Sequence, residues 1–476
     1  MSRRRASFGL GLAATLLAGC ATAPEPTPDE TRADALQHVQ VPQAWARQAS
    51  TAPVEAGWLA TFGDPQLDAL VIEALAHNPD LAMAAARVEQ AEAQVDLAAA
   101  QLKPAIGILG RAGSKPVSDL VAMLSGVMLR LAWEIDLWGR LRYQRNAAMA
   151  QRDASSADYR FARQSLAASV ARAWFVAAET AQQAKLANMM ASDAERLVAL
   201  SNDRMRVGAG SETDVMTARA SQANYRDAAQ QVELAHRSAL RALEILVGRY
   251  PAAAIESRAD LAPFPGPVPA GMPMDALDRR PDLVAAQRRV AAAFDLVGAA
   301  KASFWPGLTL SAGYGRVSRE AANLAQSTDQ TTASASATAV VPLYTGGQLT
   351  GNVRLRTAEQ REAVANYARL VLQALNEVES TLDAETTLAT REELLRISAE
   401  DSRRAAGLTE ESYRVGKSDL RDVMNRQLAA NAADVALLAV RRERLVRRVD
   451  LHLALGGDFV AGTQDDAQAS ATESTR

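Results

Sequence analysis

The chain repeats a long part of itself. NPDLAMAAARVEQAEAQV, which starts at Asn78, aligns with RPDLVAAQRRVAAAFDLV, which starts at Arg280, at an offset of 202 residues (282 − 80 for the aspartates). Farther along, RVGAGSETDV from Arg206 aligns with RVGKSDLRDV from Arg414 at an offset of 208 (416 − 208 for the glycines). The second copy therefore carries a six-residue insertion (208 − 202). Because duplicated sequences fold into duplicated units, any fold for this chain has to be built twice.

Each copy predicts a short helix, two strands, a very long helix and a second short helix. In the first copy, residues 65–102 and 211–247 are Ala-rich with helical spacing, and residues 141–205 contain no proline. At 1.5 Å per residue, that uninterrupted stretch predicts a helix of roughly 100 Å. Aromatic residues are scarce at 5%, while alanine, the best helix former, is abundant, which favours closely packed helices. A Pro/Gly-rich connector, residues 262–273, separates the two copies.

The predicted strands have one apolar side. ASASATAVVPL (Ala333–Leu343) and LRLAWEIDL (Leu129–Leu137) alternate strictly. A strand of a soluble sandwich also alternates, but strands of about ten residues with an apolar outside and a polar inside suit an outer-membrane barrel. Four strands cannot close a barrel, because the smallest needs about eight, so several copies are expected to share one. The polar segments Arg319–Gln330 and Gly113–Asp119 are predicted to be external loops.

The N-terminus reads as a secretion signal. Arg3, Arg4 and Arg5 precede an apolar run that closes on LAGC (Leu17–Cys20), which predicts a signal peptide over residues 1–19. Ending such a signal on cysteine resembles the lipobox of bacterial lipoproteins, so Cys20 is the expected lipidation site and residues 20–63 a lipidated extension. The alternative is an ordinary signal peptide with a chance cysteine. With no other cysteine in the chain, neither a disulfide nor a cysteine metal site is possible within it.

Several motifs together resemble one family. WEIDLWGRL (133–141), VPLYTGGQL (341–349) and the paired Val-Gly turns are similar to those of the TolC-type outer-membrane efflux factors, in their RND-associated, NodT-like lipoprotein branch. The resemblance implies a mainly α fold with a small β part. Duplicated long-helix hairpins would form a trimeric α-helical barrel, and four strands per chain would form a shared twelve-stranded transmembrane β-barrel. The two repeats are then expected at residues 64–261 and 274–457, followed by a disordered tail at 458–476.

The resemblance also implies a function. Such proteins are the exit ducts of tripartite efflux pumps: homotrimers that work with a periplasmic adaptor (membrane fusion protein) and an inner-membrane transporter, here of the RND type. The expected location is the outer membrane of a Gram-negative bacterium, in contact with its lipids, with a lipid anchor and a long periplasmic portion. Ala21 follows the cysteine where an aspartate would favour the inner membrane. Two alternatives stay open: the duct of a type I protein secretion system, and a periplasmic coiled-coil scaffold lipoprotein, which would lack lipid-facing strands.

Other function classes find little support in the sequence. The net charge of −3 leaves no basic field for nucleic acid. The four histidines are scattered, away from cysteine, paired carboxylates or a Gly-rich loop, so no enzyme, cofactor or metal site is expected.

The paired Val-Gly turns are the candidate functional site. Gly208 and Gly416 suit helix ends that need a left-handed residue. In the family, these turns form the periplasmic tip that meets the adaptor, and the residues expected to do so are Val207, Gly208, Val415 and Gly416. The resemblance further implies a hydrogen bond between Tyr413 and Asp214 that holds the entrance shut, and an acidic ring at Asp422. The complete expected gate is Thr213, Asp214, Tyr413, Asp422 and Asn425, with departures from the family pattern at Asn425, Leu428 and Ser418.

Overall fold

A computed structural model describes residues 24–47, 52–54, 56–111, 123–257, 260–320 and 327–459. The predicted signal peptide and Cys20 lie outside the described residues. The chain forms two compact units. The first consists of Met1–Gln40, Ala86–Ala157 and Asp282–Leu370, and the second of Val41–Ala85, Asp158–Pro281 and Val371–Arg476.

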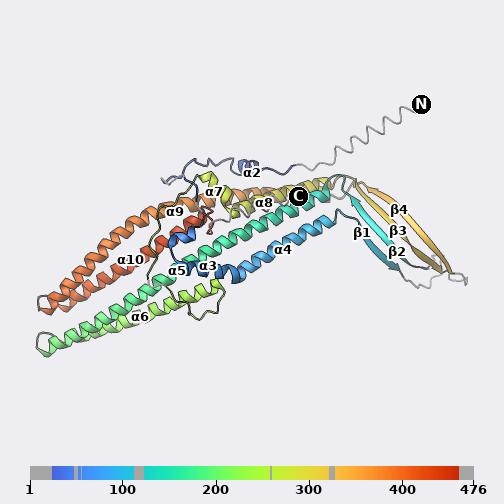
Figure 1. Cartoon of the computed structure of the whole chain (residues 1–476). Coiled ribbons are helices and arrows are strands. Elements are labelled where there is room, and N and C mark those ends of the chain that lie inside the picture. The colour runs from blue at the N-terminus through green and yellow to red at the C-terminus, as the bar shows by residue number, and fades with distance from the viewer. Residues whose placement is uncertain are drawn as a thin grey trace. The chain divides into compact units, whose positions relative to one another are not determined.

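The longest helices confirm the duplication. Helices α5 (Arg140–Arg206) and α9 (Gln348–Arg414) have 67 residues each and start 208 residues apart (348 − 140). Each is followed by a helix of about half that length, α6 (Glu212–Val247) or α10 (Leu420–Ala454) (Figure 1). None of the described helices combines the length and the apolar character needed to cross a lipid bilayer.

The predicted helix over residues 65–102 is in fact two helices, and the same is true of the second copy. Helix α3 (Pro65–His77) ends before Asn78, and α4 (Pro79–Ala100) begins after it. A residue that precedes proline is pushed out of the helical region, and Asn78 is extended, with φ −70° and ψ 125°. Its side chain then accepts a hydrogen bond from the Leu81 N–H over 3.0 Å and so caps α4. In the second copy, Arg280 likewise separates α7 (Pro273–Arg279) from α8 (Pro281–Ala302).

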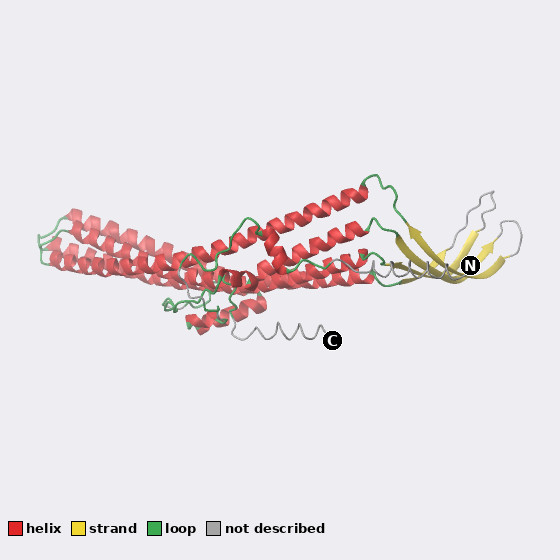
Figure 2. Cartoon of the chain, turned by 90° about the horizontal axis from the view of Figure 1, so that it is seen from above, coloured by secondary structure: helices red, strands yellow, loops and turns green. Residues whose placement is uncertain are grey.

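The four strands form one antiparallel sheet in the order β1-β2-β3-β4. They are drawn in yellow in Figure 2. Its members are β1 (Ala105–Arg111), β2 (Met123–Ile135), β3 (Gly307–Glu320) and β4 (Ser327–Val340). Strands β3 and β4 have 14 residues each and pair as far as Glu320 with Ser327. The predicted loop Arg319–Gln330 was therefore too long. Only residues 321–326 separate the strands, and these, like Gly113–Asp119, lie outside the described residues.

The register of the sheet places rows of apolar residues from all four strands on one face. Ile108 pairs with Leu129, Leu129 with Tyr314, and Tyr314 with Ala333. Ile108, Leu129 and Tyr314 are 74%, 49% and 62% exposed in the single chain. On the opposite face, the row next to it runs Gly107, Arg130, Gly313 and Ser334. The alternation predicted for single strands thus aligns across the sheet into a largely apolar face.

Segments outside the two repeats contribute to the core of the second unit. The 3₁₀ helix η2 (Trp58–Phe62) places Trp58 and Phe62 against Trp174 and Phe175 of α5. Phe459 packs in the same cluster, and the Asp458 carbonyl accepts the Gly57 N–H over 2.8 Å. The prediction of a disordered tail is therefore wrong for Asp458 and Phe459, and residues 460–476 lie outside the described residues. In the first unit, the extension carries a short helix, α2 (Pro28–Ala35).

Candidate functional site

The two Val-Gly turns have the same backbone structure. Gly208 and Gly416 end α5 and α9 at φ +75° and +79°, a left-handed conformation that glycine adopts without strain. The Gly208 N–H donates to the Met205 carbonyl over 3.0 Å and the Ala209 N–H to the Arg204 carbonyl over 2.8 Å. This pair of bonds defines a Schellman motif, and the second turn repeats it with Gly416 to Tyr413 (3.0 Å) and Lys417 to Ser412 (2.8 Å).

Each turn presents an apolar residue to solvent. Val207 is 74% and Val415 65% exposed. They stand at the residue just before each glycine, where the helix has ended. The two predicted tip pairs therefore occupy equivalent, accessible positions in the two hairpins.

Residues of the predicted gate take part in the N-terminal caps of the helices that follow the turns. Ser211 and Asp214 form a capping box: the Asp214 N–H donates to Ser211 Oγ (3.2 Å), and the Ser211 N–H donates to the Asp214 carboxylate (3.0 Å). In the second hairpin, Asp419 caps α10 by accepting the Asp422 N–H over 2.8 Å. The Ser418 hydroxyl donates to the Asp422 carboxylate over 3.4 Å.

Tyr413 lies in a small core where four helices meet. It is 3% exposed and packs with Leu197 of α5, Ala218 of α6, and Leu420 and Val423 of α10. Its hydroxyl is buried and, among the described residues, has no hydrogen-bond partner. The Asp214 carboxylate is engaged with its own capping box instead. Within one chain, the structure therefore brings Tyr413 between the hairpins but does not bond it to Asp214.

The remaining gate residues lie on an accessible face of α10. Asp422, Asn425 and Leu428 are exposed and three residues apart, so they share one side of the helix, while Val423 faces the core. Thr213 is exposed in the first turn of α6. One turn after Asp422 stands the neutral amide of Asn425, and three residues further stands the apolar Leu428.

Sequence reasoning missed a residue that contacts both turns. Arg204, in the last turn of α5, donates from Nη1 to the Tyr413 carbonyl and from Nη2 to the Ala209 carbonyl, the latter over 3.1 Å. Its guanidinium also lies 4.4 Å from the centre of the Tyr413 ring. The periodic pattern gives no signal for such a contact, because the two residues are 209 positions apart.

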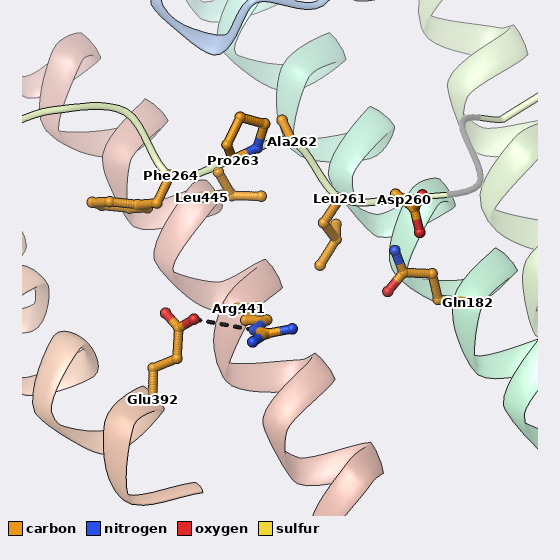
Figure 3. A pocket seen from close by; sticks show the side chains of 9 residues that line it. All are labelled: Gln182, Asp260, Leu261, Ala262, Pro263, Phe264, Glu392, Arg441 and Leu445. Atoms are coloured by element: carbon orange, nitrogen blue, oxygen red, sulfur yellow. Dashed lines mark hydrogen bonds and ion pairs between the residues drawn. The ribbon is translucent and has the colours of Figure 1, made fainter. Parts of the chain in front are cut away.

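A cavity of about 360 Å³ lies elsewhere in the second unit, beside the connector (Figure 3). Its wall includes Gln182 of α5, Phe264 of the connector, and Glu392 and Arg441 of α9 and α10. The Arg441 Nε donates to Glu392 over 3.1 Å, and Phe264 is covered by two further guanidiniums of α10 at 3.8 and 4.4 Å. The two arginine contacts with Phe264 fix the connector to α10, while Glu392 and Arg441 of the wall pair with each other.

Within the described part of the chain, no group of three or more His, Cys, Asp or Glu side chains is arranged to hold a metal ion. His236 approaches the Thr180 hydroxyl at 3.1 Å, and His452 stacks on Trp58 with ring centres 5.4 Å apart. Both are accounted for by packing.

Known proteins resemble this chain over nearly its whole length. The Pseudomonas putida pyoverdine export outer membrane protein OpmQ is 29% identical over 95% of this chain and 97% of its own. The toluene efflux pump outer membrane protein TtgC of the same species is 28% identical over 98% of this chain and 99% of its own. The Salmonella typhimurium "Probable outer membrane lipoprotein SilC" is 28% identical over 85% of this chain and 89% of its own.

Solved structures show the same fold. The outer-membrane channel OprN superimposes with a TM-score of 0.78, 26% identity and coverage of 92% of this chain and 98% of its own. VceC of Vibrio cholerae gives 0.77 and 25%, with 86% of this chain and 100% of its own covered. These TolC-type trimeric channels confirm the predicted fold class, a mainly α chain with a small β part.

The family pattern described as "Outer membrane efflux protein" matches residues 70–249 and 272–457, one stretch for each repeat. Members of this family are channels, and the relatives above work at the outer membrane in efflux. With most of both repeats matched, the chain belongs to the outer membrane efflux protein family and is an outer-membrane channel of an efflux pump.

Proposed function

We propose that three copies of this chain form an exit duct, and that an adaptor and an inner-membrane transporter of the RND type deliver substrate to it at the hairpin tips. The four-stranded sheet is the observation that supports a trimer. Strands β1 and β4 each have an outer edge with no partner among the described residues, and one face carries apolar rows from all four strands. Lipid does not tolerate open strand edges, so neighbouring copies have to pair them. Three copies supply twelve strands, an even number within the range of outer-membrane barrels.

The N-terminus adds a lipid anchor to this assembly. Cys20 closes the LAGC motif, and SilC carries the word lipoprotein in its name. Acyl chains on Cys20 would hold the chain at the outer membrane independently of the sheet.

The tips are the proposed contact with the adaptor. Two valines that are 74% and 65% exposed, Val207 and Val415, stand at matching positions in the turns that end the two hairpins. Paired exposed apolar side chains on matching turns favour a protein partner.

The gate is proposed to close through Tyr413 and Asp214. A buried hydroxyl without a partner costs free energy, so Tyr413 Oη needs an acceptor in the closed trimer. Asp214 supplies it when its carboxylate turns away from the Ser211 N–H. A phenol and a carboxylate form a short, charge-assisted bond that breaks without unfolding either hairpin.

Ion conductance tests this gate. Purified trimers that carry Tyr413→Phe together with Asp214→Ala should conduct more in a planar bilayer than wild-type trimers. Ser211→Ala is the matched control, because it breaks the same capping box and leaves the Asp214 carboxylate in place. Asp422→Asn should instead lower the preference for cations without raising conductance, since rings of carboxylates select cations. Wild-type conductance of the intact double-variant trimer would disprove the gate.

A further inference from the structure

Arg204 joins the two hairpins through their backbones. Its two terminal nitrogens donate to the Tyr413 carbonyl, in the last turn of α9, and to the Ala209 carbonyl, just after α5. The guanidinium covers the Tyr413 ring at 4.4 Å. One side chain of the first hairpin therefore contacts both turns at the tip.

The positions of these acceptors suit a cation. The carbonyls at the end of a helix carry the negative end of its dipole, and Tyr413 O lies in the last turn of α9. A guanidinium donates from a flat fork, so it reaches two carbonyls and stacks on a ring at once, which a lysine cannot do. The Tyr413 carbonyl also accepts the Gly416 N–H, so the contact with Arg204 acts on the turn itself.

Only the first hairpin supplies an arginine for this contact between the hairpins. At the offset of 208, Arg204 corresponds to Ser412, whose hydroxyl donates to Leu408 of its own helix over 2.9 Å. Tyr413 corresponds to Met205, which is 40% exposed. The second hairpin therefore has no equivalent arginine with which to hold the first. The neighbouring basic residue Arg206 pairs with Asp203 inside α5 and does not cross.

We propose that Arg204 is a positioning residue of the entrance: it holds the α9–α10 tip against the α5–α6 tip, and the entrance opens when its guanidinium leaves the Tyr413 carbonyl. The opening step rests on the proposed function of the tips as the entrance. The contact is separate from the Tyr413 hydroxyl, because it uses the backbone and the ring face. Tyr413→Phe should therefore leave it intact.

Two measurements on the same trimers test the proposal. The first is the distance between spin labels at Val207→Cys and Val415→Cys, the exposed tip residues, in a Cys20→Ser background so that no other thiol is present. The second is conductance in a planar bilayer. Arg204→Met should lengthen and broaden the label distances and raise conductance severalfold. Arg204→Lys should fall between Arg204→Met and wild type, because the charge stays while the fork is lost.

Arg206→Met is the matched control, a substitution two residues away in the same turn that should change neither measurement. Label distances that stay as in wild type in Arg204→Met trimers would overturn the proposal. Longer distances with unchanged conductance would confirm that Arg204 holds the tips together and would overturn the assignment of the tips as the entrance.

Discussion

Trp174 donates its indole N–H to the carboxylate of Asp64 over 2.9 Å, and both side chains are buried. The same carboxylate begins α3, because it accepts the N–H groups of Gln66 and Leu67 at 3.1 and 3.3 Å. One buried acid therefore caps a short helix and ties it to the long helix α5. In the second repeat, Leu382 occupies the position equivalent to Trp174 (382 − 174 = 208). Leu382 is a core residue whose side chain needs no hydrogen-bond acceptor.

Loss of this carboxylate should destabilise the second unit. Asp64→Ala leaves the indole N–H without its acceptor and removes the cap, which together should cost about 2–4 kcal/mol. Asp64→Asn retains an acceptor oxygen and should cost less. The midpoint of urea unfolding, followed by tryptophan fluorescence, measures both. Asp80→Ala, at an exposed acid in the first turn of α4, is the control. Equal midpoints for Asp64→Ala and Asp80→Ala would contradict the assigned role.

His452 should make the folded protein sensitive to acid. Burial, and to a lesser degree the nearby Arg448 charge, lower the pKa of its ring to about 3 from an ordinary value of 6.5. Between these two pH values, His452 is protonated in the unfolded chain and neutral in the folded chain. Stability therefore falls as pH drops through this window, by about 1.4 kcal/mol per pH unit.

His452→Phe should remove this dependence, because phenylalanine keeps the stack on Trp58 and does not titrate. Thermal unfolding midpoints at pH 7, 6, 5 and 4 should fall less in this variant than in wild type. His38→Gln, at an exposed histidine, should follow the wild-type curve. Parallel curves for wild type and His452→Phe would show that another group causes the acid sensitivity.

Much of the fold could be predicted because its signals are local. Proline-free, Ala-rich stretches predicted α5 and α9, and alternation predicted the exposed apolar face of the sheet. The break at Asn78 was missed although Pro79 indicates it. The outer ends of β3 and β4 were taken for a loop because they are polar. Their pairing, from Arg319 with Thr328 onward, is set by the ladder and not by side-chain propensity.

The turns of the candidate site were predictable because their backbone conformation requires one residue type, glycine. Gly208 and Gly416 stand at positive φ, where other residues are strained, so the turns could be placed from the sequence. Arg204 could not, since its contacts depend on how two hairpins pack. The only signal was a mismatch between the copies, an arginine where the second copy has Ser412.

Lipidation at Cys20 can be tested directly. Wild-type cells grown with labelled palmitate should yield labelled protein, and Cys20→Ser should not incorporate the label, because its hydroxyl is not a substrate for thioether formation. Ala21→Ser, beside the cysteine, should label normally and is the control for expression. Label at the N-terminus of the Cys20→Ser protein would disprove the lipobox.

The orientation of the sheet in the membrane gives the last prediction. Residues 321–326 join β3 to β4 at the strand ends away from the starts of α5 and α9, since the other end of β4 leads into α9. With the helices in the periplasm, this connection should face the outside of the cell. An epitope inserted between Asn323 and Leu324 should therefore bind antibody on intact cells.

The matched insertion belongs in the first tip turn, between Ala209 and Gly210. There antibody should bind only after the outer membrane is broken. A misfolded channel would expose either epitope to antibody. Gel filtration should therefore show that both insertion variants remain trimeric. On intact cells, antibody binding to the tip-turn epitope but not to the epitope after Asn323 would contradict the proposed topology. It would also contradict the assignment of the tips to the periplasmic entrance.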